Sequence, residues 1–142
     1  MLIEYEKIFS KIHRKTVAMA LEKLAKNNKA KIYLTFYINK PGIVIPQFFK
    51  EKYTEKSVIL LDNDSCCNLK VENQVIYVDL TFNKIMSTLI IPIKHVIKYE
   101  DKLQNIELNF IEDEEDENVN NAQYDQKDLI INFQDILKKN NK

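Results

Sequence analysis

The chain has 142 residues, of which 45% are hydrophobic, and its 21 basic and 21 acidic side chains give a formal net charge of zero. The length and composition are those of one globular domain, and the balanced charge excludes a strong global field for nucleic acid or anionic lipid. The sequence begins without a basic segment followed by an apolar one, and no apolar run reaches the length of a bilayer span. We therefore expect a cytoplasmic protein without a membrane partner.

The segment from Leu2 to Ala25 contains no Gly or Pro and has apolar residues at helical spacing, which predicts one long amphipathic helix. The apolar positions form two strips that are displaced around the helix. The first strip consists of Tyr5, Ile8, Phe9, Ile12, Met19 and Ala20, and the second of Val17, Leu21 and Leu24. Either both strips face one core, or one covers the sheet and the other needs a second surface, which a homodimer formed through this helix would supply.

Residues 31–92 contain a series of strand-like runs separated by turn residues. The run from Ile32 to Ile38 is largely apolar on both faces, which predicts a central strand. Pro41-Gly42 and Asn83-Lys84 are typical of turns, and Pro46 can begin a short helix that ends near Tyr53. The other expected extended segments are 43–45, 58–61, 69–71, 75–82, 89–92 and 108–111, with a short helical or extended connection at 95–99.

The composition changes after Ile111. Glu112 to Glu117 form an unbroken acidic block that polar residues follow, and such a segment is expected to be disordered and extended. The apolar cluster from Leu129 to Leu137 either docks back on the core as a last strand or helix, or is a linear motif that binds another protein. The expected organisation is therefore a helix at 1–28, a β core at 29–111, an acidic linker at 112–128 and a terminal motif at 129–142.

No catalytic or metal-binding pattern stands out in the sequence. His13 and His95 are isolated, the single Gly excludes Gly-rich phosphate loops, and no Cys or His pairs recur at metal-ligand spacing, so we expect no cofactor and no metal. A disulfide between the adjacent Cys66 and Cys67 would be strained, which favours free thiols in a reducing compartment.

Two other function classes stay open at this point. One is an enzyme that uses Cys66 as its nucleophile. The other is a small β-barrel nucleic-acid-binding protein, and its stacking platform would consist of Tyr33, Phe36, Tyr37 and Phe82. The lack of excess basic charge weakens this second alternative, because affinity for nucleic acid comes mainly from cationic side chains on phosphates.

The order of motifs along the chain is more specific than any one of them. In the core they are 34–38, Pro41-Gly42, Ile45-Pro46, 58–61, Asn68-Leu69, 80–82 and Ile91-Pro92; near the end they are Ile130, Ile131, Phe133, Ile136, Leu137, Lys138 and Lys139. This order resembles the stringent starvation protein B (SspB) family, which are adaptors of the ClpXP protease. The first helix lies where that family has its dimerisation helix, and the end of the chain is similar to the family's terminal ClpX-docking motif.

The resemblance implies a mainly β fold in which an N-terminal helix precedes two small antiparallel sheets, packed as a sandwich or a partly open barrel and assembled as a homodimer. It implies a bacterial adaptor, not an enzyme, that binds ssrA-type degradation tags and delivers tagged proteins to ClpX. A groove between residues 43–49, residues 58–61 and Phe82 would hold an extended peptide through apolar pockets and exposed backbone groups. The expected groove residues are Val44, Ile45, Pro46, Phe49, Leu60, Leu61, Asp62 and Phe82, and the expected dimer-helix residues are Ile8, Ile12, Val17, Leu21 and Leu24.

Three features depart from the family pattern. Asn83-Lys84 stands where the family commonly has Gly-Gly or Asn-Gly, which predicts a less tight turn. The loop from Asp62 to Ser65 is one residue longer than in the branch with the similar tail, so that a Gln that contacts the bound peptide falls near Asp62. Phe133 and Ile136 exchange the usual order of aliphatic and aromatic residues, which predicts weaker docking to ClpX.

Overall fold

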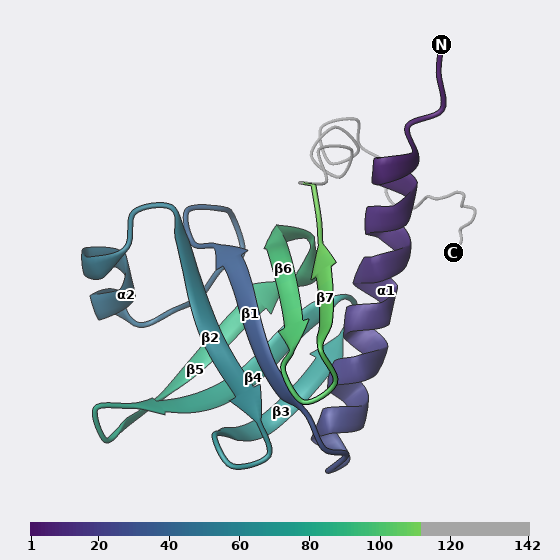
Figure 1. Cartoon of the computed structure of the whole chain (residues 1–142). Helices are drawn as coiled ribbons and strands as arrows, with labels where there is room; N and C mark the ends of the chain where they lie inside the picture. The colour runs from purple at the N-terminus through teal and green to yellow at the C-terminus, as the bar shows by residue number, and fades with distance from the viewer. Residues whose placement is uncertain (112–142) are drawn as a thin grey trace. The chain divides into compact units, whose positions relative to one another are not determined.

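The structure is a computed structural model that describes residues 1–111, and it consists of one long helix and two antiparallel sheets (Figure 1). The predicted linker at 112–128 and terminal motif at 129–142 lie outside the described residues. The elements are α1 (Tyr5–Ala25), β1 (Lys31–Tyr37), α2 (Gln47–Lys52), β2 (Lys56–Asp62), β3 (Cys66–Glu72), β4 (Val75–Phe82), β5 (Ile85–Pro92), the 3₁₀ helix η1 (Ile93–His95), β6 (Val96–Asp101) and β7 (Ile106–Asn109).

The predicted first helix is present, and it begins at Tyr5 instead of Leu2. Its end has a Schellman motif: the backbone N–H of Asn28 donates to the carbonyl of Lys23 (3.0 Å), and that of Asn27 to the carbonyl of Leu24 (2.9 Å). Asn27 takes a positive φ of 74°, which Asn tolerates better than most residues. This geometry ends the helix and directs the chain into β1.

The two sheets have the strand orders β2-β1-β6-β7 and β3-β4-β5, and they are not closed into a barrel. The predicted mainly β fold with an N-terminal helix and two antiparallel sheets is therefore confirmed. β1 is central, as predicted, and its alternate residues Ile32, Leu34 and Phe36 are fully buried between the sheets. The connection expected at 95–99 is the end of η1 followed by β6, which pairs with β1.

Asn83-Lys84 forms a tight two-residue turn, contrary to the looser turn that we expected. Both residues have positive φ, 50° and 68°, and the pairing of β4 with β5 continues to Phe82 opposite Ile85. Positive φ at both central positions is the geometry of a type I′ hairpin, and Asn at the first position lowers its cost. The turn between β3 and β4 is built in the same way, with Asn73 and Gln74 at φ 53° and 61°.

The long connection from β1 to β2 spans the gap between the sheets. Val44 pairs with Ile90 of β5 through two backbone hydrogen bonds of 2.9 and 3.0 Å, so this connection adds to the edge of the second sheet. Gly42 takes a φ of 88°, and a Cβ there would lie 3.1 Å from Pro92. The glycine therefore lets the connection pass close to the end of β5. The connection then forms α2 before the chain enters β2 (Figure 1).

Helix α1 covers the opposite side, where it packs mainly against β3 and η1 (Figure 1). Buried Arg14 fixes the end of the described chain to this helix: its guanidinium lies 5.3 Å from the ring centroid of Phe110 and donates to the carbonyl of Ile111. The backbone N–H of Ile111 also donates to the hydroxyl of Ser10 (3.2 Å). With α1 on one side, the side of α2 and the β4–β5 turn is the more open one.

Candidate functional site

Four aromatic side chains meet at α2 and the end of β4. Phe48 and Phe49 come from α2, Tyr53 follows it, and Phe82 ends β4. The ring centroid of Phe82 lies 5.5 Å from that of Phe48 and 4.9 Å from that of Phe49, and these rings meet edge to face. Tyr53 packs against Phe49 in the same manner at 6.0 Å. We call these four residues the aromatic cluster.

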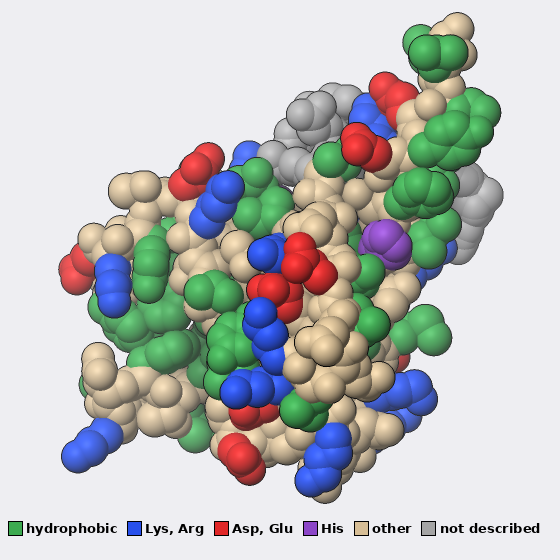
Figure 2. Space-filling view, in the orientation of Figure 1, with side chains coloured by type: hydrophobic (Ala, Val, Ile, Leu, Met, Phe, Trp, Pro, Cys, Tyr) green, Lys and Arg blue, Asp and Glu red, His purple; other side chains and the backbone are tan. Residues whose placement is uncertain are grey.

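The aromatic cluster is anchored inside the core and open on one side. Phe49 is 5% exposed, whereas Phe48 beside it on the helix is 39% exposed. Ile85, which stands directly opposite Phe82 in the hairpin, is 67% exposed, and Val44 is about half exposed. Figure 2 shows hydrophobic side chains gathered on the side of the molecule where α2 and the β4–β5 turn lie. An apolar surface with a rigid aromatic base is suited to holding apolar side chains of a ligand.

The structure brings together only some of the residues expected in the groove. Phe49 and Phe82 belong to the aromatic cluster, and exposed Val44 and half-buried Pro46 lie in the segment leading to α2. Ile45 and Leu61 are instead buried in the core. The remaining two, Leu60 and Asp62, alternate with the buried residues of β2 and so face the outer side of the four-stranded sheet.

The assignment of Leu60 and Leu61 to one groove was therefore wrong for Leu61. Successive residues of a strand point to opposite faces, and the inward positions of β2 are Ser57, Ile59 and Leu61. The Asp62 carboxylate is held within its own turn, where it accepts hydrogen bonds from the backbone N–H groups of Asp64 (3.1 Å) and Ser65 (2.8 Å). Phe48 falls within the expected groove segment 43–49 but was not singled out there, and sequence reasoning missed Ile85, although its hairpin pairing with Phe82 could have indicated it.

The two thiols do not resemble a nucleophilic site. Both are free; Cys66 is half-buried and donates from its Sγ to the carbonyl of Asp62 (3.0 Å), while Cys67 is exposed. Burial, and next the nearby Asp62 charge, raise the pKa of the Cys66 thiol above its ordinary 9.0. A catalytic thiol needs the opposite shift, because the thiolate is the reactive form.

A cavity of about 130 Å³ lies between the loop around Cys66 and the end of α1, and one of about 340 Å³ lies at the start of α1.

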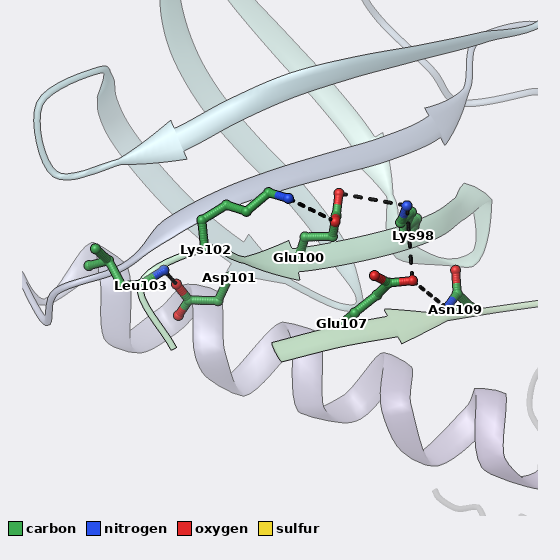
Figure 3. Close-up of polar contacts among 7 residues, drawn as sticks. All are labelled: Lys98, Glu100, Asp101, Lys102, Leu103, Glu107 and Asn109. Atoms are coloured by element: carbon green, nitrogen blue, oxygen red, sulfur yellow. Dashed lines mark hydrogen bonds and ion pairs between the residues drawn. The ribbon is translucent and has the colours of Figure 1, made fainter. Parts of the chain in front are cut away.

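The aromatic residues of the nucleic-acid alternative do not form one platform. Phe36 is fully buried, and Phe82 belongs to the aromatic cluster of the other sheet. Tyr33 and Tyr37 remain on the outer face of the four-stranded sheet. The lysines on β6 and in the turn after it are neutralised there: Lys98 lies 3.8 Å from Glu100 and 3.9 Å from Glu107, and Lys102 lies 3.2 Å from Glu100 (Figure 3). A face with balanced charge is unsuited to binding phosphates.

The two apolar strips of α1 differ in their exposure to solvent. Val17, Leu21 and Leu24 are buried in the core of their own chain, so they are not accessible to a second copy. Ile8 and Ile12 of the expected dimer helix are exposed, together with Tyr5, Phe9 and Met19 of the same strip, at 45% to 61% of their surface. The alternative in which both strips face one core is therefore excluded.

Within residues 1–111, no group of three or more His, Cys, Asp or Glu side chains is placed to hold a metal ion. No helix in the same range is long and apolar enough to cross a membrane.

Two small antiparallel sheets with a partly exposed aromatic cluster at their open side make this a mainly β protein with one candidate ligand surface. A family model described as stringent starvation protein B (SspB) matches residues 8–140 of the chain, which include most of the helix, both sheets and nearly all of the C-terminal segment. The chain therefore belongs to the SspB family, which is a family of adaptors. No curated relative matches the chain.

Proposed function

We propose that the protein binds ssrA-type degradation tags at the aromatic cluster and delivers the tagged proteins to the ClpX unfoldase of the ClpXP protease in the bacterial cytoplasm. The observation that carries this proposal is the half-exposed ring of Phe48, which rests on buried Phe49 and on Phe82 in a member of an adaptor family. A rigid, partly exposed aromatic anchor supplies binding energy for an apolar side chain at little cost in conformational entropy.

Free strand edges near the aromatic cluster support an extended peptide as the ligand. Within the part of the chain that the structure describes, β2 is an edge strand that pairs with β1 alone, and β5 is an edge strand on which Val44 covers Ile90 alone. Unpaired backbone groups of an edge strand can bind an added strand, while pockets for alternate side chains give specificity. The tag is therefore expected to lie extended across Phe48, with Val44 and Ile85 at the border of the site.

The exposed strip of α1 supports a homodimer. A continuous row of large apolar side chains in water is unfavourable, and pairing it with the same row of a second copy would bury both. We assign Ile8 and Ile12 to this interface, with Tyr5, Phe9 and Met19 added from their exposure.

The C-terminal segment is assigned to ClpX. The proposed division is a β core for the tag, residues 112–128 as linker and residues 129–142 as the ClpX-binding motif, with Ile130, Ile131, Phe133, Ile136, Leu137, Lys138 and Lys139 as contact residues. Two such motifs in a dimer would raise avidity for one unfoldase ring by roughly two orders of magnitude without any new contact.

Deletion of residues 128–142 tests this division. The shortened protein should bind a labelled tag peptide with unchanged affinity, because the described core is intact. It should no longer stimulate degradation of a tagged fluorescent protein by ClpXP. Stimulation that survives the deletion would show that the ClpX assignment is wrong, and loss of peptide binding would show that the tag site extends into the deleted segment.

A further inference from the structure

Two lysines border the aromatic cluster, and they come from two different elements. Lys52 follows Phe48 by four residues, so it lies on the same side of α2. Lys84 is the second residue of the β4–β5 turn and is next to Ile85. Phe48 and Ile85, the most exposed apolar residues of the site on these two elements, thus each have a lysine nearby, and we call Lys52 and Lys84 the rim lysines.

Some surface lysines of the structure are neutralised by a nearby carboxylate, and the rim lysines are not among them. Lys7, Lys70, Lys98 and Lys102 each form an ion pair with a glutamate. Within residues 1–111, no rim lysine has a carboxylate within ion-pair distance, and the ammonium of Lys52 lies 5.7 Å from the ring centroid of Tyr53. Lys52 therefore lies against the aromatic cluster and, among the described residues, has no carboxylate paired with it.

The local charge is positive although the chain as a whole is neutral. Residues 47–56 and the turn residues 83–84 contain four lysines and two glutamates, a net charge of +2, against zero for the whole sequence. Uncompensated charge at the border of an apolar site raises the local concentration of oppositely charged ligands and speeds their association. The field is local, so it was not evident from the total charge.

We propose that the site selects acidic peptides: apolar side chains bind on the aromatic cluster, and flanking Asp or Glu side chains pair with the rim lysines. This inference rests on the proposed tag-binding function and adds the charge of the ligand to it. Exposed charge pairs contribute mainly to the rate of association, and salt screens them over a distance of about 8 to 10 Å at physiological ionic strength. Selection for acidic peptides should therefore be strong at low salt and weak at high salt.

The test uses two labelled peptides that share their aliphatic residues and differ only in carrying glutamate or glutamine. The full-length protein is compared with a variant that combines Lys52→Gln and Lys84→Gln. The second change makes the turn Asn-Gln, which is the pair that already forms the turn at Asn73 and Gln74, so the hairpin should be retained. The matched control combines Lys26→Gln and Lys29→Gln, which removes the same charge at exposed positions after α1, on the other side of the molecule (Figure 1).

Stopped-flow anisotropy at low and high salt gives the association and dissociation rates. We expect the rim variant to bind the glutamate peptide on the order of fivefold more slowly at low salt, with little change for the glutamine peptide or in the control. Equal association rates of the two peptides with the unmodified protein would overturn the inference and leave tag binding intact. No binding of either peptide would contradict tag binding itself. Loss of self-association in the rim variant would assign this surface to a second copy, which also overturns the inference.

Discussion

Replacing Phe48 or Phe49 with alanine separates binding from folding at two neighbouring positions. Phe49 is 5% exposed and contacts Phe48, Tyr53 and Phe82, whereas Phe48 is 39% exposed and, among the aromatic rings of residues 1–111, contacts Phe49 and Phe82. If the exposed ring of Phe48 is the anchor for the tag, its removal should affect affinity more than stability. Removal of Phe49 should lower stability more than it lowers affinity, because it opens a cavity in the core.

The burial of each ring sets the expected loss of stability and of affinity. A buried Phe→Ala change costs about 3 to 5 kcal/mol, which for a domain of this size lowers the melting temperature by roughly 15 °C. Phe48→Ala loses part of its burial and two edge-to-face contacts, which is about 1 to 2 kcal/mol, or roughly 5 °C. A desolvated aromatic anchor contributes about 1 to 2 kcal/mol or more to binding, so the dissociation constant of the tag should rise about tenfold in Phe48→Ala.

Thermal unfolding by circular dichroism and peptide anisotropy, both on the full-length protein, measure the two quantities. Anisotropy is recorded well below the melting temperature of each variant, so that the fraction unfolded does not enter the affinity. An unchanged dissociation constant in Phe48→Ala would refute the assignment of this ring. A melting temperature that falls equally in both variants would refute the assigned difference in burial.

Three further predictions follow from single side chains. Ile12→Glu should dissociate the proposed dimer in sedimentation and leave a monomer with an unchanged circular dichroism spectrum, because Ile12 is exposed within its own chain; a monomeric parent protein would contradict the interface. Hydrogen bonds from Asn68 (2.7 Å) and Thr88 (2.6 Å) hold the pKa of Asp79 below its ordinary 3.8. The stability that these hydrogen bonds contribute is therefore complete above the ordinary pKa and is lost as the pH falls through the lower pKa of the folded state. Thr88→Val should raise that pKa in an NMR titration, and an unchanged value would rule out the hydroxyl as a cause. Exposed Cys67 should be alkylated faster than Cys66, whose thiol pKa is raised by burial. Cys67→Ser leaves Cys66 as the reactive thiol and should abolish the fast phase of alkylation. A fast phase that persists in this variant would contradict the order.

The regular elements could be predicted because their patterns are local. The 21-residue helix α1 has continuous helical spacing without Gly or Pro, and β1 alternates over its whole length. The orientation of β2 was also readable in principle, because a period of two places Ile59 and Leu61 on one face and Leu60 on the other. The misplacement of Leu61 in a groove came from grouping neighbours in sequence as neighbours in space.

The site itself depends on contacts that no local pattern contains. Val44 pairs with Ile90 of β5, and the rings of Phe48 and Phe49 on α2 meet the ring of Phe82 on β4. Such contacts are set by how the connection between β1 and β2 crosses to the second sheet, which depends on the tight passage of Gly42 past Pro92. The exposed strip of α1 was visible in the sequence as the first of two apolar strips, but only the packing shows that the second strip is the one facing the core.

Binding of a fluorescein-labelled ssrA-type tag peptide, compared with a scrambled peptide of the same composition, tests the central proposal most directly. The scrambled peptide keeps the charge and the apolar content, so a difference between the two reports recognition of an ordered extended sequence and not general attraction to an apolar or basic surface. The proposed function predicts saturable binding of the tag peptide that is at least about tenfold tighter than that of the scrambled one. Equal affinities, or no binding of either peptide, would contradict it.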